Sequence, residues 1–185
     1  MDRLTAVNLI LPKLGEHVVT SLAQRHSTVA LILDEVDSQV RTLCQRGWWF
    51  NEYSTTLQRN TAQEIELPLN ALSFLPDDMS FNAVQRAGKL FNADTLNFTW
   101  AAPMAGTLKV LLDFEELPES AAQAAWYSAL CAVYVTDIGM AQDLQMWDQA
   151  RISAATTMEA EHLDQKKYST ARTYRYQRIR SAMRG

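Results

Sequence analysis

The sequence predicts an α+β protein: a four-helix bundle with a small antiparallel β-sheet inserted between the second and third helices. Hydrophobic residues follow helical spacing before residue 47 and after residue 118, and they alternate with polar residues in between. Because helical stripes flank the strands on both sides, a bundle with an inserted sheet is the simplest packing. We therefore expect one domain over 1–164, helical in 4–47 and 118–164 and β-rich in 48–114, followed by a basic C-terminal arm over 165–185.

Local signals predict the first two helices. A short helix over Leu4–Leu14 must tolerate Pro12, and Gly15 then supplies the permissive backbone that commonly ends a helix. Either Ser27 or Thr28 can cap the second helix, which Gly47 ends. Its hydrophobic residues recur at helical spacing and are Val29, Ile32, Leu33, Val36, Val40, Leu43 and Cys44.

The middle of the chain changes to a period of two, which is typical of strands with one buried face. Ala87-Gly88 predicts a hairpin, and the alternating residues from Leu108 to Phe114 predict a last strand. Two further strands are predicted where Ile65, Leu67 and Leu69 alternate with Glu64, Glu66 and Pro68, and where Leu96, Phe98 and Trp100 alternate with Asn97 and Thr99.

Two more helices follow the strands. Pro118 and Glu119 open the third helix, because proline fits the first turn and an acidic side chain there complements the helix dipole. Its hydrophobic face consists of Ala122, Ala125, Trp126, Ala129, Leu130 and Val133. After a break near Gly139, a fourth helix runs from Asp143 to about Asp164, with Leu144, Trp147, Ala154, Met158 and Leu163 inward.

Charge is distributed unevenly along the chain. The net charge is −4, yet the segment from Gln165 to Gly185 holds seven of the 17 basic residues and no acidic one. Residues 1–164 therefore carry 10 basic against 21 acidic side chains, a net charge of −11. An acidic body repels a passing polyphosphate, whereas a basic arm seeks an acidic surface or nucleic acid.

Motifs for enzymatic chemistry are missing from the sequence. The six glycines are too far apart for a phosphate-binding loop, and His17, His26 and His162 belong to no metal-binding or catalytic pattern. Cys44 and Cys131 form no CxxC pair, and neither the N-terminus nor the uncharged stretch from Ser120 to Thr136 has the character of a secretion signal or membrane helix. We expect no cofactor, no metal, no membrane contact and no enzymatic activity.

Two pairs of adjacent carboxylates leave one catalytic alternative open. Asp77-Asp78 and Glu115-Glu116 could perform acid–base chemistry, as in glycoside hydrolysis, if a pocket separated their pKa values. Both pairs lie near prolines at element boundaries, so a solvated turn or a helix start also accounts for them.

The aromatic run Trp48-Trp49-Phe50 has two interpretations. It packs in the core where the bundle meets the sheet, or it forms a subunit interface. The fold needs at least one of the three rings inside. The arm interleaves tyrosine with arginine, a mixture found both on nucleic acid and at protein interfaces.

Three stretches of the chain have the character of family motifs. They are Ala6-Val7-Asn8-Leu9-Ile10-Leu11 followed by Leu14-Gly15-Glu16, then Arg46-Gly47-Trp48-Trp49-Phe50-Asn51, and then Phe114 to Val135. They resemble, in this order, the opening, the turn from the second helix into the sheet and the third helix of the phage tail tubular protein A family, the head-to-tail adaptor of short-tailed bacteriophages. The resemblance reaches from about residue 5 to 135 and does not extend to the arm.

The resemblance implies a structural virion protein of the phage tail. Members form a homo-oligomeric ring, expected to be twelvefold, between the portal protein and the tail nozzle, tail tubular protein B, with tail fibres as a further partner. DNA passes through the lumen without specific binding during ejection. The subunit would be made in the host cytoplasm and would act at the head–tail junction.

On this hypothesis Trp48, Trp49 and Phe50 form the subunit interface. The arm binds the portal through Lys166, Lys167, Tyr168, Arg172, Tyr174, Arg175, Tyr176, Arg178, Ile179, Arg180, Met183 and Arg184. The alternatives are a nucleic-acid-binding module that acts through the arm and a tail-associated glycan hydrolase.

Overall fold

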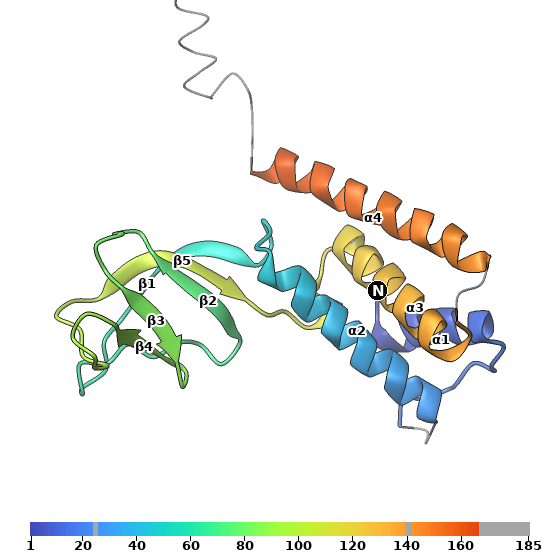
Figure 1. The fold of residues 1–185 in the computed structure, drawn as a ribbon, viewed down its shortest axis with the longest axis horizontal. Coiled ribbons are helices and arrows are strands. Elements are labelled where there is room, and N and C mark those ends of the chain that lie inside the picture. The colour runs from blue at the N-terminus through green and yellow to red at the C-terminus, as the bar shows by residue number, and fades with distance from the viewer. Residues whose placement is uncertain (24–25, 140–141, 167–185) are drawn as a thin grey trace, which may run out of the picture.

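Helices and strands occupy opposite ends of an elongated molecule in the computed structural model, which describes residues 1–23, 26–139 and 142–166 (Figure 1). The helices are α1 (Arg3–Ile10), α2 (Ser27–Gln45), α3 (Glu119–Asp137) and α4 (Asp143–Gln165), with 3-10 turns at Leu11–Leu14 and Phe114–Glu116. The strands are β1 (Glu52–Leu57), β2 (Ala71–Pro76), β3 (Ala83–Arg86), β4 (Lys89–Asn92) and β5 (Met104–Val110). The α+β class, with helices before and after the strands, is confirmed.

Helix α3 is the centre of the helical end and packs against both α2 and α4. Its apolar face is buried as predicted, and the indole of Trp126 donates a hydrogen bond to the carbonyl of Ala6 in α1 (3.0 Å). The shared core of the helical end contains buried residues from all four helices. That these helices form a regular bundle stays a prediction.

Two details of the predicted helices are wrong. The residue before the first turn of α2 is His26, so Ser27 and Thr28 do not cap this helix, and the hydroxyl of Thr28 instead donates to Glu16 (2.8 Å). Leu163 was expected inside but is 53% exposed, because α4 turns His162 toward the aromatic rings of Trp48 and Trp49 at this level. The predicted first helix is also divided at Pro12, because α1 ends at Ile10 and the chain continues as a 3-10 turn that tolerates this proline.

The β end contains two small antiparallel sheets where the sequence predicted one. Three strands form the larger sheet in the order β1-β5-β2, and β3 and β4 form a separate hairpin. The predicted hairpin turn is confirmed, since Ala87 and Gly88 both adopt left-handed backbone, with φ of 49° and 72°.

The predicted strands over residues 65–69 and 96–100 are wrong, since both segments form only isolated bridges. Ile65 and Trp100 are buried as the alternation requires, yet Leu69 is fully exposed and Leu96 has a φ of 57°, which no strand allows. The last strand is also shorter than predicted. It ends at Val110, and Phe114 belongs to a 3-10 turn within the helical core.

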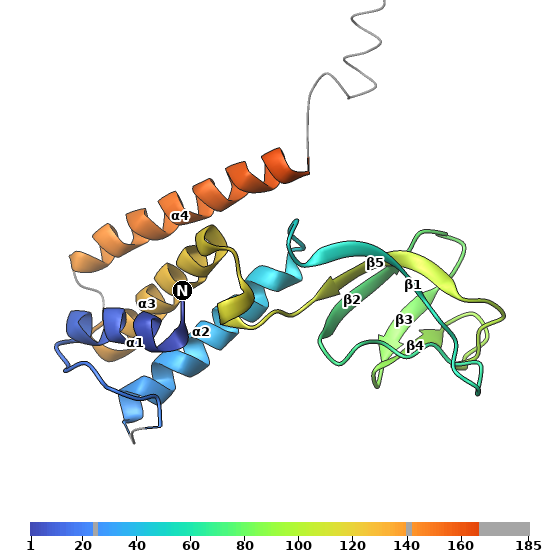
Figure 2. The ribbon, with the colours of Figure 1, turned by 180° about the vertical axis from the view of Figure 1, so that it is seen from behind.

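The hydrophobic interior is divided into two cores, one among the helices and one between the two sheets. Leu112 packs against both of them. The two chain connections between the ends, after α2 and after β5, run side by side in both views (Figures 1 and 2). The segment from Arg46 to Glu52 forms the first of these connections, and we call it the joint.

Candidate assembly site at the joint

The second residue of the joint, Gly47, is a glycine that no other residue replaces without strain. Gly47 adopts left-handed backbone with a φ of 78°, and its N–H donates to the carbonyl of Cys44 in the last turn of α2 (3.3 Å). A β-carbon at Gly47 would also collide with the side chains of Glu52 and Lys109. The turn out of α2 therefore favours glycine for its conformation, and an added β-carbon would in addition have to displace the flexible ends of these two side chains.

Asn51 connects the helical end to the sheet. Its side chain is fully buried, and its Nδ2 donates to the carbonyls of Cys44 in α2 and Val110 in β5, both at 2.8 Å. Its Oδ1 accepts from the N–H of Trp48 (2.8 Å), and its own carbonyl accepts from the N–H of Val110 (3.0 Å). A buried amide with all of these partners holds a defined geometry, because losing one leaves a buried polar group unpaired.

Trp48 forms the inner wall of the joint. Its ring is 4% exposed, and its Nε1 donates to the carbonyl of Leu43 (2.8 Å). The guanidinium of Arg46 lies over this ring, 5.1 Å from its centroid. At least one ring of the aromatic run is thus inside, as the sequence predicts.

Trp49 and Phe50 extend this cluster toward the surface. Both are half-buried, and their rings meet edge to face with centroids 4.9 Å apart. The imidazole of His162 lies 6.0 Å from the Trp49 ring centroid, so α4 contributes to the same cluster. Two large rings that remain partly accessible in the single chain can serve a subunit contact.

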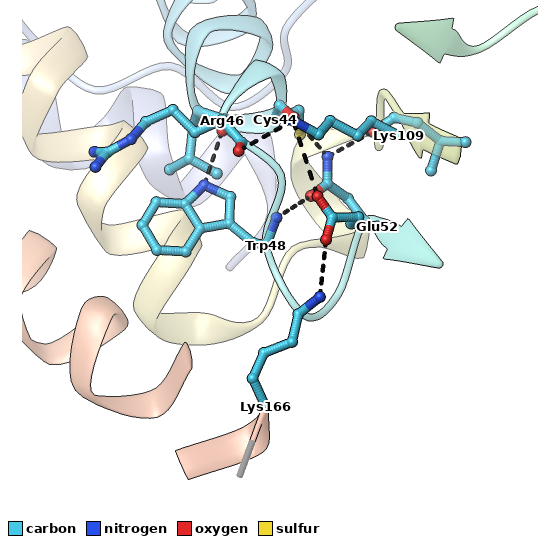
Figure 3. A network of polar contacts seen from close by, with 9 residues as sticks. Cys44, Arg46, Trp48, Glu52, Lys109 and Lys166 are labelled. Carbon is cyan, nitrogen blue, oxygen red and sulfur yellow. Dashed lines mark hydrogen bonds and ion pairs between the residues drawn. The ribbon is translucent and has the colours of Figure 1, made fainter. Parts of the chain in front are cut away.

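A layer of charged side chains covers the joint (Figure 3). Glu52 accepts from Nζ of Lys166 at 2.9 Å and lies 3.9 Å from Nζ of Lys109, which also donates to the carbonyl of Arg46 (3.3 Å). Arg46 in turn pairs with Glu159 of α4 (3.6 Å). The end of α4 and the first residue of β1 are therefore held together.

Of the twelve residues predicted to contact the portal, only Lys166 falls in the part of the chain that the structure describes. The remaining eleven residues of the predicted portal contact, from Lys167 to Arg184, lie outside the described residues. Their role stays a prediction.

Neither carboxylate pair has the environment of a catalytic acid. The backbone N–H of Ser80 donates to Asp78 and lowers the pKa of this exposed carboxyl, whereas a general acid needs a raised pKa. Glu116 accepts from the N–H of Asp113 in a capping box, and Glu115 lies near Arg3. The glycan hydrolase alternative thus gains no support from either pair.

Three further observations on the described residues concern a reactive thiol, metal ions and a membrane. Burial raises the pKa of the Cys44 thiol, which makes it a poor nucleophile. Within those ranges, no group of three or more His, Cys, Asp or Glu side chains is arranged to hold a metal ion. None of the described helices is both long and apolar enough to cross a membrane.

Sequence reasoning missed two residues of this site, Asn51 in the joint and His162 in α4. Asn51 was singled out only as the last residue of the string that resembles the family's turn into the sheet, and no local signal marks it as a buried hydrogen-bonded group. The place of His162 carried no sequence signal, because its partners Trp48 and Trp49 lie more than a hundred positions earlier in the chain.

Comparison with known proteins identifies the class. The family model described as tail tubular protein matches residues 4–168, so the chain belongs to this family. Tail tubular protein A of Klebsiella phage KP34 is 28% identical over 182 residues, which covers 98% of both chains. The chain is therefore a structural component of a phage tail, and its place is the tail of the virion. Both the helical end and the β end fall within the matched region.

Proposed function

We propose that this chain is the repeating subunit of a head-to-tail adaptor ring, which joins the portal to the tail nozzle around the DNA exit channel. The observation that carries the proposal is the match to tail tubular proteins over nearly the whole chain. The portal lies on one side of the ring and tail tubular protein B on the other, with tail fibres as a further partner. The subunit is made in the host cytoplasm and assembles at the head–tail junction as a ring of twelve copies.

The charge of the body supports a role around DNA. Residues 1–164 have a net charge of −11, from 10 basic and 21 acidic side chains. Contacts between phosphates and basic side chains dominate the affinity of proteins for DNA, so an acidic wall lets duplex DNA pass without binding it. A basic lumen would instead bind the phosphates and slow the exit of the DNA.

The joint supplies the subunit contact in this proposal. Trp49 and Phe50 reach a neighbouring subunit, while Trp48 supports them from inside the chain. Aromatic residues with rigid backing are frequent hot spots of protein interfaces. The basic arm binds the portal, and the four helices form the bundle whose faces make the remaining subunit contacts.

Assembly on purified portal tests the proposal. Alone, the chain is expected to be monomeric or weakly associated, since a circular template favours ring closure from head-to-tail contacts. Mixed with portal, it is expected in one ring-shaped complex with cyclic symmetry, as seen by mass measurement and electron microscopy. A stable two-fold dimer that ignores the portal would contradict the proposal.

A further inference from the structure

Helix α4 has an exposed face that carries no charged side chain. Its buried residues Ala154 and Met158 point into the helical core. The opposite face consists of eight residues that are all exposed and all uncharged, namely Gln145, Met146, Gln149, Ile152, Ser153, Thr156, Ala160 and Leu163. Surface helices usually show the reverse pattern, with charged side chains toward water. This face, which we call the outer face of α4, has the composition of a contact surface, because interface cores are depleted of charged residues.

The outer face can be covered at a low desolvation cost. Three of its residues are large and apolar, since Met146, Ile152 and Leu163 are 56%, 44% and 53% exposed. Between them, the hydroxyl of Thr156 donates to the carbonyl of Ile152 one turn earlier (2.9 Å). Because this hydroxyl is already bonded within its own helix, covering Thr156 costs less free energy than covering a free hydroxyl.

The charged residues of α4 point away from the outer face. Asp148 accepts from Nε of Arg151 within the helix (2.8 Å), and Glu159 pairs with Arg46 of the joint (3.6 Å). By helical spacing, these side chains of α4 lie beside or behind the outer face. Such an arrangement resembles an uncharged interface core with a polar rim.

The outer face continues into the aromatic cluster of the joint. Leu163, its last residue, lines the same surface hollow as Trp48 and His162. The imidazole of His162 also contacts the half-buried ring of Trp49. A partner that covers the outer face therefore also reaches the rings that we propose as a subunit contact.

The N-terminal segment contains a second exposed apolar surface. Nδ2 of Asn8 donates to the carbonyl of Val19, and Oδ1 of Asn8 accepts from the N–H of Val19, both at 2.9 Å. These two hydrogen bonds hold residues 8–9 beside residues 18–19. Leu9 and Val18 are 43% and 60% exposed there.

Charge favours a second copy of the chain as the occupant of the outer face. Residues 1–164 have a net charge of −11, from 10 basic and 21 acidic side chains, so two subunits repel each other where their acidic residues meet. Residues 1–23 are neutral, because they contain two acidic and two basic side chains, namely Asp2, Glu16, Arg3 and Lys13. The outer face and the N-terminal segment are therefore surfaces through which two acidic subunits can touch with little repulsion.

We infer that the outer face of α4 packs against Leu9 and Val18 of a second copy of this chain. The inference rests on the proposed ring, whose head-to-tail contacts require two different surfaces on each subunit. Helix α4 supplies one of them and the segment that precedes α2 supplies the other. In both views, α4 and α2 lie on opposite sides of α3 (Figures 1 and 2).

Photochemical cross-linking of the full chain identifies the occupant. A chain with photoreactive benzoylphenylalanine in place of Thr156 is mixed with isotope-labelled wild-type chain and irradiated, both in concentrated solution and on portal. Mass spectrometry is expected to find adducts to labelled peptides that contain Leu9 or Val18. The matched control carries the same group in place of Thr42 of α2, another exposed threonine whose hydroxyl donates one turn back, to Ser38 (3.0 Å). This control is expected to lose these adducts.

A charge on the outer face should weaken the contact between copies. Thr156→Lys is expected to weaken the self-association of the concentrated chain by about tenfold or more, because a lysine charge would lose its water. Thr42→Lys adds the same charge and loses an equivalent hydroxyl bond, and it is expected to leave the association unchanged. Sedimentation measures the association, and thermal unfolding checks that both variants fold.

Several outcomes would overturn this inference. Adducts to labelled α4 would show that two copies pair through the same face, and adducts to portal would show that portal covers it. Adducts to no other chain, or equal association of the two lysine variants, would show that the face stays open. If the expected adducts form in concentrated solution but no ring forms on portal, the proposed function fails and this contact stands. A ring that forms without these adducts removes only the contact.

Discussion

The indole of Trp48 meets the imidazole of His162 edge to face, with ring centroids 5.2 Å apart. This contact joins the start of the connection to the sheet with the last turn of α4. Together with the pair Lys166–Glu52, it fixes the end of α4 against the joint. The orientation of the helix that precedes the arm therefore depends on the same residues that orient the sheet.

Alanine substitutions at Trp48 and Trp49 are expected to differ. Loss of the buried Trp48 ring should lower the free energy of unfolding by about 3 to 5 kcal/mol. The half-buried Trp49 should contribute less to the single chain, so Trp49→Ala should melt near the wild type and yet fail to join the ring. Thermal unfolding and assembly on portal measure the two effects. If both variants simply unfold the subunit, the aromatic run is no interface.

Asn51→Leu is expected to destabilise the chain strongly. The change leaves the buried carbonyls of Cys44 and Val110 without their donor, at a cost of about 1 to 3 kcal/mol for each unpaired group. Asn70→Leu is the control, because Asn70 is exposed and donates one longer bond to Leu111 (3.2 Å). Urea unfolding compares the two, and similar midpoints would show that Asn51 does not hold the joint.

Gly47→Ala and Gly15→Ala separate backbone strain from close packing. Both glycines have nearly the same left-handed backbone, with φ of 78° and 79°. An alanine should cost about 1 to 2 kcal/mol at either position for conformation alone. Gly15 has open space around an added methyl group, whereas Gly47 faces Glu52 and Lys109, so Gly47→Ala should be the less stable variant. Equal stability would mean that the two side chains move aside freely.

Truncation after Asp164 tests the arm. It should leave a folded body that no longer binds portal, because the segment with seven basic residues and no acidic one is removed. Circular dichroism checks the fold and co-sedimentation checks the binding. A nucleic-acid-binding module would behave differently: the intact chain would bind duplex DNA with steep salt dependence, and truncation would abolish this while sparing the portal.

The pair Glu64–Lys89 should contribute to stability in a pH-dependent way. The hydrogen bond from Lys89 lowers the pKa of Glu64 below its ordinary value of 4.5. A carboxyl with a lowered pKa in the folded state stabilises it above the ordinary pKa, and this contribution is lost as the pH falls through the lowered pKa. Glu64→Gln should therefore flatten the loss of stability below pH 4.5. Lys89→Met should flatten this loss of stability equally, as measured by urea unfolding between neutral and acid pH. If the stability of both variants fell with pH as steeply as that of the wild type, the pair would not be the cause of the loss.

The helices and the division of the chain into helical and β-rich parts could be predicted from sequence because their signals are local. The face of α3 and the turn at Ala87-Gly88 follow from spacing alone. The segment around Ile65 could not be assigned correctly in this way. Its alternating burial comes from packing against the β3–β4 hairpin, where Leu90 donates to the carbonyl of Ile65 (3.0 Å), and not from a continuous ladder.

The sequence could predict where the joint lies but not which contacts it makes. The aromatic run marks where helices and sheet meet, yet the bond of Asn51 to Val110 spans 59 positions and no local pattern encodes it. The contacts of His162 and Lys166 are likewise set by how α4 returns across the molecule.

Two cores that meet at Leu112 and at the buried amide of Asn51 have a geometric consequence for the proposed ring. Each subunit must present its two contact faces at the angle that divides a full turn equally. A few degrees of error in every copy would add up around the circle, and the last copy would not meet the first. The hydrogen bonds of Asn51 hold the helical core and the sheet core at a fixed angle. In the proposed ring, the accuracy of closure would therefore depend on a side chain that is buried inside the subunit.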